Sequence, residues 1–159
     1  MSDADARSEP VARDADAAAD DPYVEVVRAV GHEHVSAEHA STFEVTTDDW
    51  LTPAGDCIVG IEADRAPADF DDGFVAACRD PGATVTLTLE TADARAEVRA
   101  RGHPDLTFES DRSAVVRTST YVDDRTVAVG ADTAATGLHR DLVAALADGA
   151  ALTLSLTVE

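Results

Sequence analysis

The sequence predicts a mainly β domain of the α+β class, built as a single antiparallel β-sandwich with two covering helices. Apolar and polar residues alternate at period two through most of the chain after residue 22, which is typical of strands with one buried face. Only two segments show helical spacing instead. Neither a Gly-x-Gly-x-x-Gly nor a Walker A motif is present, so the pattern argues against a doubly wound parallel sheet.

The chain divides into a short acidic segment and one folded domain. Residues 1–21 are rich in Asp and Ala and lack aromatic residues, a composition that predicts a disordered acidic tail. Pro22 marks the boundary, and residues 22–159 form the expected domain. An apolar content of 45% is enough for a core without disulfides, because a domain of this size buries about two-thirds of its unfolded surface.

Nine segments are expected to be extended. The clearest is 83–90, in which Val85 and Leu87 face one way and the alternating threonines the other. In chain order the expected strands are residues 23–30, 41–46, 56–63, 83–90, 94–101, 106–109, 114–118, 126–129 and 152–158.

Two segments are expected to be helical. Residues 68–79 carry Phe70, Phe74 and Cys78 at a spacing of four, and a Pro-Gly pair follows them. Residues 132–148 carry a stripe of leucines, with an Asp at the start and a Gly just past the end. Both stripes predict packing against the core rather than a ligand site.

The charge of the chain indicates a habitat. The formal net charge is −20, from 32 acidic residues against 12 basic residues that are all arginine. At molar salt the Debye length is about 3 Å, so a surface this acidic suits a halophilic cytoplasmic protein. The same charge argues against direct nucleic-acid binding. Neither a signal-peptide pattern nor an apolar run of membrane-spanning length occurs, so we expect no membrane association.

The first candidate for chemistry is a group of histidines. His32 and His34 would lie on one face of a strand, at a spacing that suits metal ligands, and His39, Glu44 or Asp56 could complete a site. The alternative is that these histidines cap a turn between two strands. The absence of His-Glu-x-x-His and Cys-x-x-Cys favours the alternative, so no metal site is predicted.

The second candidate is Cys57, which follows Asp56 and could be a nucleophile. Strand alternation instead places Cys57 with Val59 and Ile61 on a face that should belong to the core. A thiol in apolar surroundings keeps a raised pKa and stays inert, so we expect a buried Cys57 that reacts slowly. Asp56 would then face polar surroundings.

The third candidate is the placement of arginines at strand ends. Arg117 ends one expected strand, and Arg125 precedes Thr126 at the start of the next. Such arginines are either salt-bridge partners for the acidic surface or a fork that binds an anion. With Ser119 and His103 nearby in the sequence, the second interpretation is the best ligand-site signal in the chain.

Short motifs occur in a fixed order along the chain: Gly31-His32, His39, Thr42-Phe43-Glu44-Val45-Thr46, Leu51-Thr52-x-x-Gly55-Asp56-Cys57-Ile58, Ala63-Asp64, Gly102-x-Pro104-x-Leu106-Thr107, Arg117-x-Ser119 and Asp124-Arg125-Thr126. Over about residues 23–159 they resemble an archaeal family known as a domain of unknown function (number 371). The resemblance implies a small, jelly-roll-like β-sandwich with no assigned reaction. His34, Ala100 and His103 depart from the family pattern, while its polar residues match His32, His39, Glu44, Thr46, Asp56, Cys57, Arg117, Ser119, Asp124 and Arg125.

Together these features predict one polar site that binds a small anionic metabolite. His39, Glu44 and Asp56 are the candidate acid–base groups. The expected ligand-binding residues are Arg117, Ser119, Asp124, Arg125, Thr46 and His32. Whether the ligand is transformed, which cofactor would serve and what the oligomeric state is stay open at this point. The alternative is a non-catalytic accessory protein that acts through protein or ribonucleoprotein contacts, for which an exposed apolar patch would be the sign.

Overall fold

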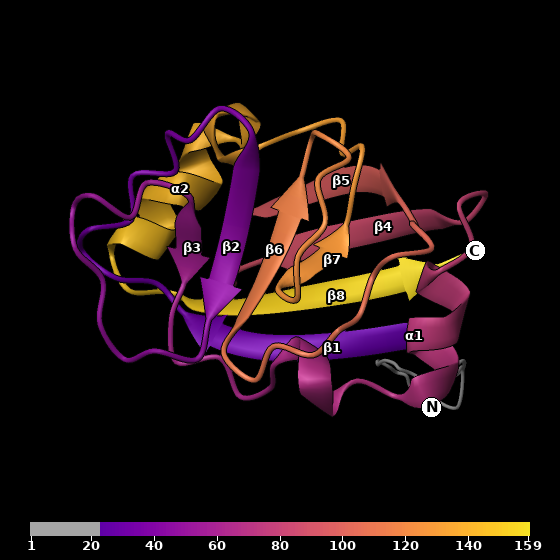
Figure 1. Ribbon diagram of the computed structural model, residues 1–159. Helices are drawn as coiled ribbons and strands as arrows, with labels where there is room; N and C mark the ends of the chain where they lie inside the picture. The colour runs from indigo at the N-terminus through magenta and orange to yellow at the C-terminus, as the bar shows by residue number, and fades with distance from the viewer. Residues whose placement is uncertain (1–22) are drawn as a thin grey trace, which may run out of the picture.

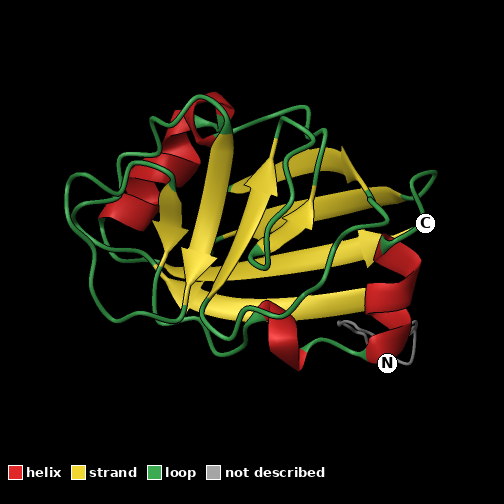
Figure 2. Cartoon of the chain, in the orientation of Figure 1, coloured by secondary structure: helices red, strands yellow, loops and turns green. Residues whose placement is uncertain are grey.

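The computed structural model describes residues 23–159, so the acidic tail expected over residues 1–21 lies outside the described residues. Within that range, eight strands form two four-stranded sheets, and two helices lie near opposite ends of the molecule (Figures 1 and 2). The strands are β1 (Val24–Val30), β2 (Thr42–Thr46), β3 (Ile58–Gly60), β4 (Thr84–Glu90), β5 (Arg95–Arg101), β6 (Ser113–Arg117), β7 (Thr126–Ala128) and β8 (Ala151–Val158). The helices are α1 (Asp72–Cys78) and α2 (Arg140–Ala147), which follow the 3-10 turns η1 (Pro67–Asp69) and η2 (Ala135–Gly137).

The two sheets differ in strand direction. The first, in the order β1-β8-β4-β5, is antiparallel throughout. The second, β3-β2-β6-β7, has an antiparallel central pair flanked by parallel pairs, β2 with β3 and β6 with β7. The mainly β fold class with two helices is therefore confirmed. The parallel pairs refine it, because period-two alternation reports which face a residue occupies and not the direction of its neighbour.

The core lies between the sheets and continues under the helices. Val27, Phe43, Leu87 and Leu154 are each at most 1% exposed and come from strands of both sheets. The predicted helix stripes are confirmed as core residues, since Phe70, Phe74, Cys78, Leu138, Leu142 and Leu146 are all buried. Single bridges also join the edges of the two sheets, from β1 to Ile61 and from β5 to Val129.

The fold contains the same unit twice. β1, β2, β3, α1 and β4 occur in the same order as β5, β6, β7, α2 and β8, and each sheet order reads the same when the two units are exchanged. Contacts match as well: the backbone N–H of Arg28 donates to Asp64 Oδ1 at 2.9 Å, and that of Arg99 donates to Asp132 Oδ1 at 3.2 Å. The two units are therefore related by an approximate twofold axis.

The pairing of the central strands locates this axis. By the spacing that relates Arg28 to Arg99, Glu44 on β2 corresponds to Val115 on β6. These two residues are directly paired across β2 and β6. The axis therefore crosses the second sheet between Glu44 and Val115.

Two glycines show how closely the units are joined. A Cβ atom on Gly31, just after β1, would meet the Leu146 carbonyl of α2. A Cβ atom on Gly102, just after β5, would meet the Cys78 carbonyl of α1. Only glycine allows this approach, so the first strand of each unit leaves its sheet against the helix of the other unit.

Candidate functional site

Two of the polar residues singled out from the sequence, Glu44 and Arg117, lie on strands of the second sheet and mark its outer face. Along β2, Phe43 and Val45 point into the core, so Glu44 points outward between them. Arg117 ends β6 on the same sheet and pairs with Thr42 of β2. The connections after β2 and β6 run over this side of the sheet (Figure 1).

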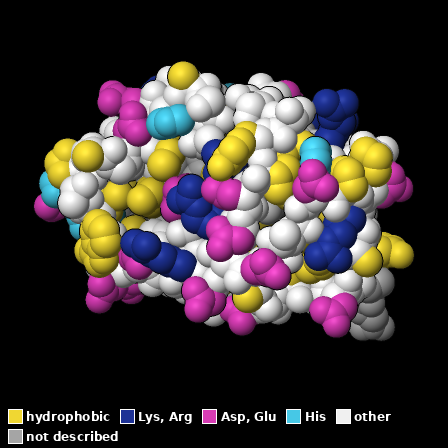
Figure 3. All heavy atoms as spheres, viewed as in Figure 1, with side chains coloured by type: hydrophobic (Ala, Val, Ile, Leu, Met, Phe, Trp, Pro, Cys, Tyr) yellow, Lys and Arg dark blue, Asp and Glu magenta, His cyan; other side chains and the backbone are white. Residues whose placement is uncertain are grey.

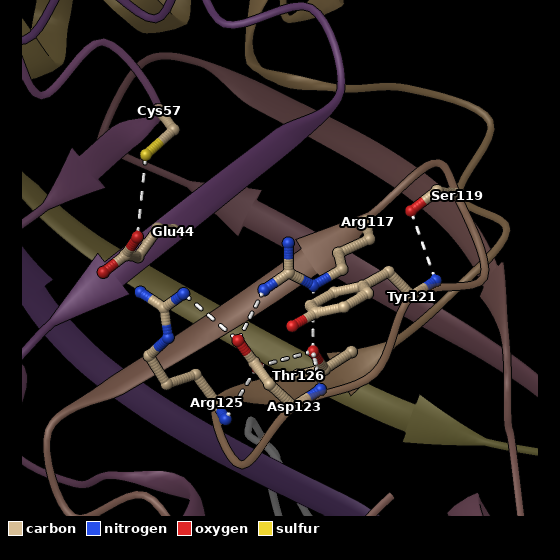
Figure 4. Close-up of polar contacts among 8 residues, drawn as sticks. All are labelled: Glu44, Cys57, Arg117, Ser119, Tyr121, Asp123, Arg125 and Thr126. Carbon is tan, nitrogen blue, oxygen red and sulfur yellow. Dashed lines mark hydrogen bonds and ion pairs between the residues drawn. The ribbon is translucent and has the colours of Figure 1, made fainter. Parts of the chain in front are cut away.

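Arg117 is fixed by three neighbours (Figure 4). Its Nε donates to Thr126 Oγ1 at 2.9 Å, and its Nη2 donates to Asp123 Oδ2 at 3.0 Å. The guanidinium also lies over the ring of Tyr121, 4.9 Å from its centroid. With 12% of its side chain exposed, Arg117 has a defined orientation and still reaches solvent.

Arg125 shares the same carboxylate. Its Nη2 donates to Asp123 Oδ2 at 3.2 Å, while 44% of its side chain is exposed. Burial alone would lower the pKa of Arg125, but the hydrogen bond and charge of Asp123 raise it, helped by the charges of Glu44 and Asp124. Arg125 therefore lies within the electrostatic influence of Glu44, which comes from the other structural unit.

Asp123 is the centre of this arrangement. Its Oδ1 accepts hydrogen bonds from the backbone N–H of Arg125 at 3.0 Å and from Thr126 Oγ1 at 2.9 Å. Burial raises the pKa of Asp123, but these hydrogen bonds and the charge of Arg117 outweigh it and hold the pKa at about 2. We call Arg117, Asp123, Arg125 and Thr126 the arginine cluster.

Glu44 and Cys57 lie beside the cluster. The Cys57 thiol donates to Glu44 Oε1 at 3.6 Å, and the backbone N–H of Glu44 donates to the Cys57 carbonyl at 2.8 Å. Burial raises the pKa of the thiol to about 11, with further contributions from the charge of Glu44 and the hydrogen bond to it. At neutral pH Cys57 is therefore a neutral donor rather than a thiolate.

The expected position of Cys57 was wrong in one respect. Cys57 is half-buried and faces Glu44, whereas Val59 is fully buried in the core. The reason is that β3 begins at Ile58, so Cys57 precedes the strand and does not follow its alternation. The expected slow reaction of the thiol stays a prediction, to which its raised pKa lends support.

His39 and Asp56 meet through the backbone. The His39 N–H donates to the Asp56 carbonyl at 3.2 Å, which brings both residues to the β2–β3 side of the site. His39 Nδ1 accepts from the backbone N–H groups of Ser41 and Thr42, each at 3.2 Å. This imidazole therefore caps the turn that leads into β2, and within residues 23–159 it makes no hydrogen bond to the arginine cluster.

His32 also has a turn-capping contact. Its Nδ1 accepts from the His34 N–H at 3.0 Å, and in the second unit His103 accepts from the Asp105 N–H at the same distance. Within residues 23–159, no group of three or more His, Cys, Asp and Glu side chains is arranged to hold a metal ion. These contacts correspond to the capping alternative for the histidines.

Three further residues expected to bind ligand lie around the cluster rather than in it. Thr46 is buried, and its hydroxyl accepts from Ser113 Oγ at 3.3 Å. The Ser119 hydroxyl accepts from the Tyr121 N–H at 3.3 Å, and Asp124 is exposed. The sequence indicates Asp124 and Arg125 of the Asp-Asp-Arg-Thr run but neither Asp123 nor Tyr121, because only the fold shows which of the two adjacent carboxylates meets the arginines.

A pocket of about 530 Å3 adjoins the cluster. It lies between residues 103–109 and 120–124, and its walls include Asp105, Glu109, Asp123 and Asp124. Acidic side chains also lie across much of the surface in this view, with arginines set among them (Figure 3). The pocket is therefore a poor place for an anion, and the arginine side of Asp123 is the better one.

Two exposed aromatic residues occupy corresponding loops. Trp50 follows β2 and is 55% exposed, while Tyr121 follows β6 and is 61% exposed. Each is the fourth residue after its strand, so the twofold relation pairs them. All four phenylalanines are buried and Tyr23 is exposed, so what distinguishes Trp50 and Tyr121 is their corresponding positions in the two units.

Comparison with known proteins confirms the resemblance inferred from the motifs. The family described as "Domain of unknown function (DUF371)" matches residues 27–159. The chain is also similar to the uncharacterised protein MJ0206 of Methanocaldococcus jannaschii, with 33% identity over 133 residues. That match covers 84% of this chain and 98% of the relative. Among the described residues, no helix has the length and apolar character needed to cross a membrane.

Proposed function

Because the chain belongs to this DUF371 family, whose function is unknown, we propose from the site alone that the protein binds a small anionic metabolite at the arginine cluster. The observation that supports this is the convergence of Arg117 and Arg125 on one oxygen of Asp123, beside Glu44 from the other unit. A carboxylate or phosphate group of the ligand would bind the guanidinium N–H donors that Asp123 and Thr126 leave free.

The geometry suits such a group. A guanidinium has five N–H donors, and the contacts within the cluster use two from Arg117 through its side chain and one from Arg125. Arg117 is held in place and Arg125 is more exposed, so a ligand would find one fixed and one adaptable partner. Each charge-assisted hydrogen bond to such a ligand would contribute about 1.5–3 kcal/mol.

His39, Glu44 and Asp56 remain the proposed acid–base groups, should the ligand be transformed. Glu44 lies on β2, and His39 and Asp56, which are joined to each other through the backbone, precede β2 and β3. Ser119 and Asp124, next to the cluster in sequence, are proposed to line its rim. We place this activity in a halophilic cytoplasm, on the basis of the net charge of −20.

The test is binding of inorganic phosphate, acetate and succinate by calorimetry in a fixed background of molar KCl. Arg125→Lys should weaken binding of any of these that binds by about tenfold or more, since an ammonium group cannot form the bidentate fork. Arg95→Lys is the matched control, because Arg95 is exposed on the other sheet. If none of the three anions binds, or if both variants bind equally well, the proposal is wrong.

The exposed aromatic pair favours a second candidate, a non-catalytic accessory protein that acts through protein or ribonucleoprotein contacts. Trp50 and Tyr121 are the kind of residues that anchor interfaces, and both lie on loops beside the site face. Trp50→Ala would then abolish co-purification of a partner from an archaeal extract while leaving phosphate binding unchanged.

A further inference from the structure

The row of residues across the centre of the second sheet carries opposite charges at its two ends. Backbone hydrogen bonds join Glu44 to Cys57 at 2.8 Å and Val115 to Arg125 at 2.9 Å, and Glu44 pairs with Val115 across the axis. The row therefore reads Cys57, Glu44, Val115, Arg125. Because these two hydrogen bonds match, Glu44 corresponds to Val115 and Cys57 corresponds to Arg125.

The two units have diverged at these corresponding positions. The first unit supplies a carboxylate, Glu44, where the second has an apolar side chain, and the second supplies a guanidinium, Arg125, where the first has a neutral thiol. At the corresponding ends of β2 and β6, the first unit has the neutral Thr46 and the second unit has the basic Arg117. The backbones of the two units are equivalent on this face of the second sheet, but the first unit makes one side of the face acidic and the second unit makes the other side basic.

Glu44 is the carboxylate of this arrangement that makes no direct ion pair within residues 23–159, although its charge acts on Arg125 and Arg112. The polar partner of its side chain is the Cys57 thiol, at 3.6 Å. A thiol is a weak donor, and the carboxylate is only partly exposed. Taking charge out of water is costly unless an opposite charge or strong donor compensates for it.

The charge balance next to Glu44 decides which ligand fits. Arg117 and Arg125 are balanced by Asp123 and Glu44, so the site as a whole has no excess positive charge. A ligand with only a negative charge would be attracted by Arg125 and repelled by Glu44. A ligand that carries both a positive and a negative charge would be attracted by both residues.

We propose that the ligand is a zwitterion that lies across the twofold axis, with a protonated primary amine at Glu44 and a carboxylate at Arg125 and Arg117. This inference rests on the proposed function and names its substrate class: free amino acids or short amino-carboxylates. The amine supplies the strong donors that Glu44 lacks, and the carboxylate takes the remaining guanidinium donors.

The experiment compares matched pairs of ligands that differ in the amine alone. Glycine, β-alanine, 4-aminobutyrate and 5-aminopentanoate are titrated beside acetate, propionate, butyrate and pentanoate, in the same molar KCl. At least one amino form should bind about tenfold more tightly than its partner without the amine, and the best chain length measures the separation of Glu44 from the arginines.

Two variants assign the contacts. Glu44→Gln should remove the advantage of the amine and leave the affinity for the plain carboxylates unchanged or higher. Glu97→Gln, on the exposed face of β5, is the matched control and should leave both series unchanged. Thermal melts of each variant check that the fold is retained.

The possible failures are distinguishable. If plain carboxylates bind and the amine adds nothing, the zwitterion inference is wrong and the anion site stands. If simple alkylamines bind as tightly as the amino acids, and Arg125→Lys has no effect, the site takes cations and both proposals are wrong. If no member of either series binds and phosphate does not bind, both proposals are wrong as well.

Discussion

Asp123 determines the shape of the arginine cluster, because one of its oxygens accepts hydrogen bonds from both Arg117 and Arg125. Its other oxygen accepts from the backbone of the same turn, so the carboxylate is fixed where the arginines meet. The sequence could indicate the arginines, since basic residues at strand ends are conspicuous in a chain with 12 of them. It could not single out Asp123 among 32 acidic residues, because what distinguishes this one is a contact made by the fold.

Asp123→Asn should destabilise the protein by about 1–3 kcal/mol at pH 7, because the largely buried guanidinium of Arg117 loses its carboxylate partner. The native pKa of about 2 lies below the ordinary value of 3.8, so the stabilisation is present above about pH 4 and is lost as the pH falls towards 2. Urea unfolding between pH 2 and pH 7 measures it. The two proteins should converge at low pH, whereas Asp124→Asn, at an exposed neighbour, should follow the wild type throughout.

Cys57 should react slowly with a thiol reagent in the native protein. A pKa of about 11 leaves only about one thiol in a thousand ionised at pH 8. Cys78 is fully buried, so it does not compete in the native state. Glu44→Gln should speed the labelling, since the charge of Glu44 raises the pKa. Labelling of the native wild type as fast as a free thiol would contradict this and restore Cys57 as a candidate nucleophile.

At the scale of elements, seven of the nine expected strands match a strand of the structure to within one residue at each end, and those over 56–63 and 106–109 do not. β4, β5 and β8 begin and end within one residue of the expected bounds, because each alternates over seven or eight residues. The expected strand over 106–109 is absent, and Phe108 there has a φ of 55°. Leu106 and Phe108 are buried from an irregular segment, which gives the same alternation without a strand.

The helices were expected to be longer than they are. The stripe over residues 68–79 is divided between η1 and α1, because Asp71 is extended and its side chain accepts the Gly73 N–H to begin a new helix. The segment over 132–148 is also divided, between η2 and α2, but the side chain of His139 before α2 makes no capping hydrogen bond. Spacing alone could not show these breaks, since both parts pack against one core.

Glu25 joins β1 to α1 through contacts that the sequence did not suggest. Its carboxylate is 7% exposed, lies 2.6 Å from Arg65 Nη1 and accepts the Asp71 N–H at 2.6 Å, where α1 is capped. Glu25→Ala should cost about 1–3 kcal/mol of unfolding free energy, because the Asp71 N–H loses its acceptor and Arg65 loses its carboxylate. Arg65 keeps its hydrogen bonds to the Val26 and Asp69 carbonyls. Chemical denaturation measures the loss. Glu97→Ala, on exposed β5, should stay within about 0.5 kcal/mol of the wild type.

At the scale of the whole molecule, the repeated unit was present in the sequence and went unnoticed. Val27-Arg28-Ala29-Val30-Gly31-His32 and Val98-Arg99-Ala100-Arg101-Gly102-His103 differ at one position. Both segments form a first strand and the glycine that passes the other unit's helix, so packing accounts for their similarity. Elsewhere the units share the apolar pattern and single residues such as Asp64 and Asp132, and the position of the site on the axis emerges only when β2 and β6 are paired.

Stability should rise with salt, because 32 acidic residues face 12 basic ones in one small domain and its preceding segment. Repulsion between like charges extends over about 10 Å at 0.1 M salt and over about 3 Å at 1 M, so added salt relieves the folded state more than the expanded one. Salt also weakens exposed ion pairs such as Arg112 with Asp48, but the less exposed contacts of Arg117 and Glu25 are screened less. The midpoint of thermal unfolding should therefore increase substantially from 0.05 M to 2 M KCl, as measured by circular dichroism. NaCl at equal ionic strength should give a similar rise if screening is the cause, and a flat or falling midpoint in both salts would contradict adaptation to high salt.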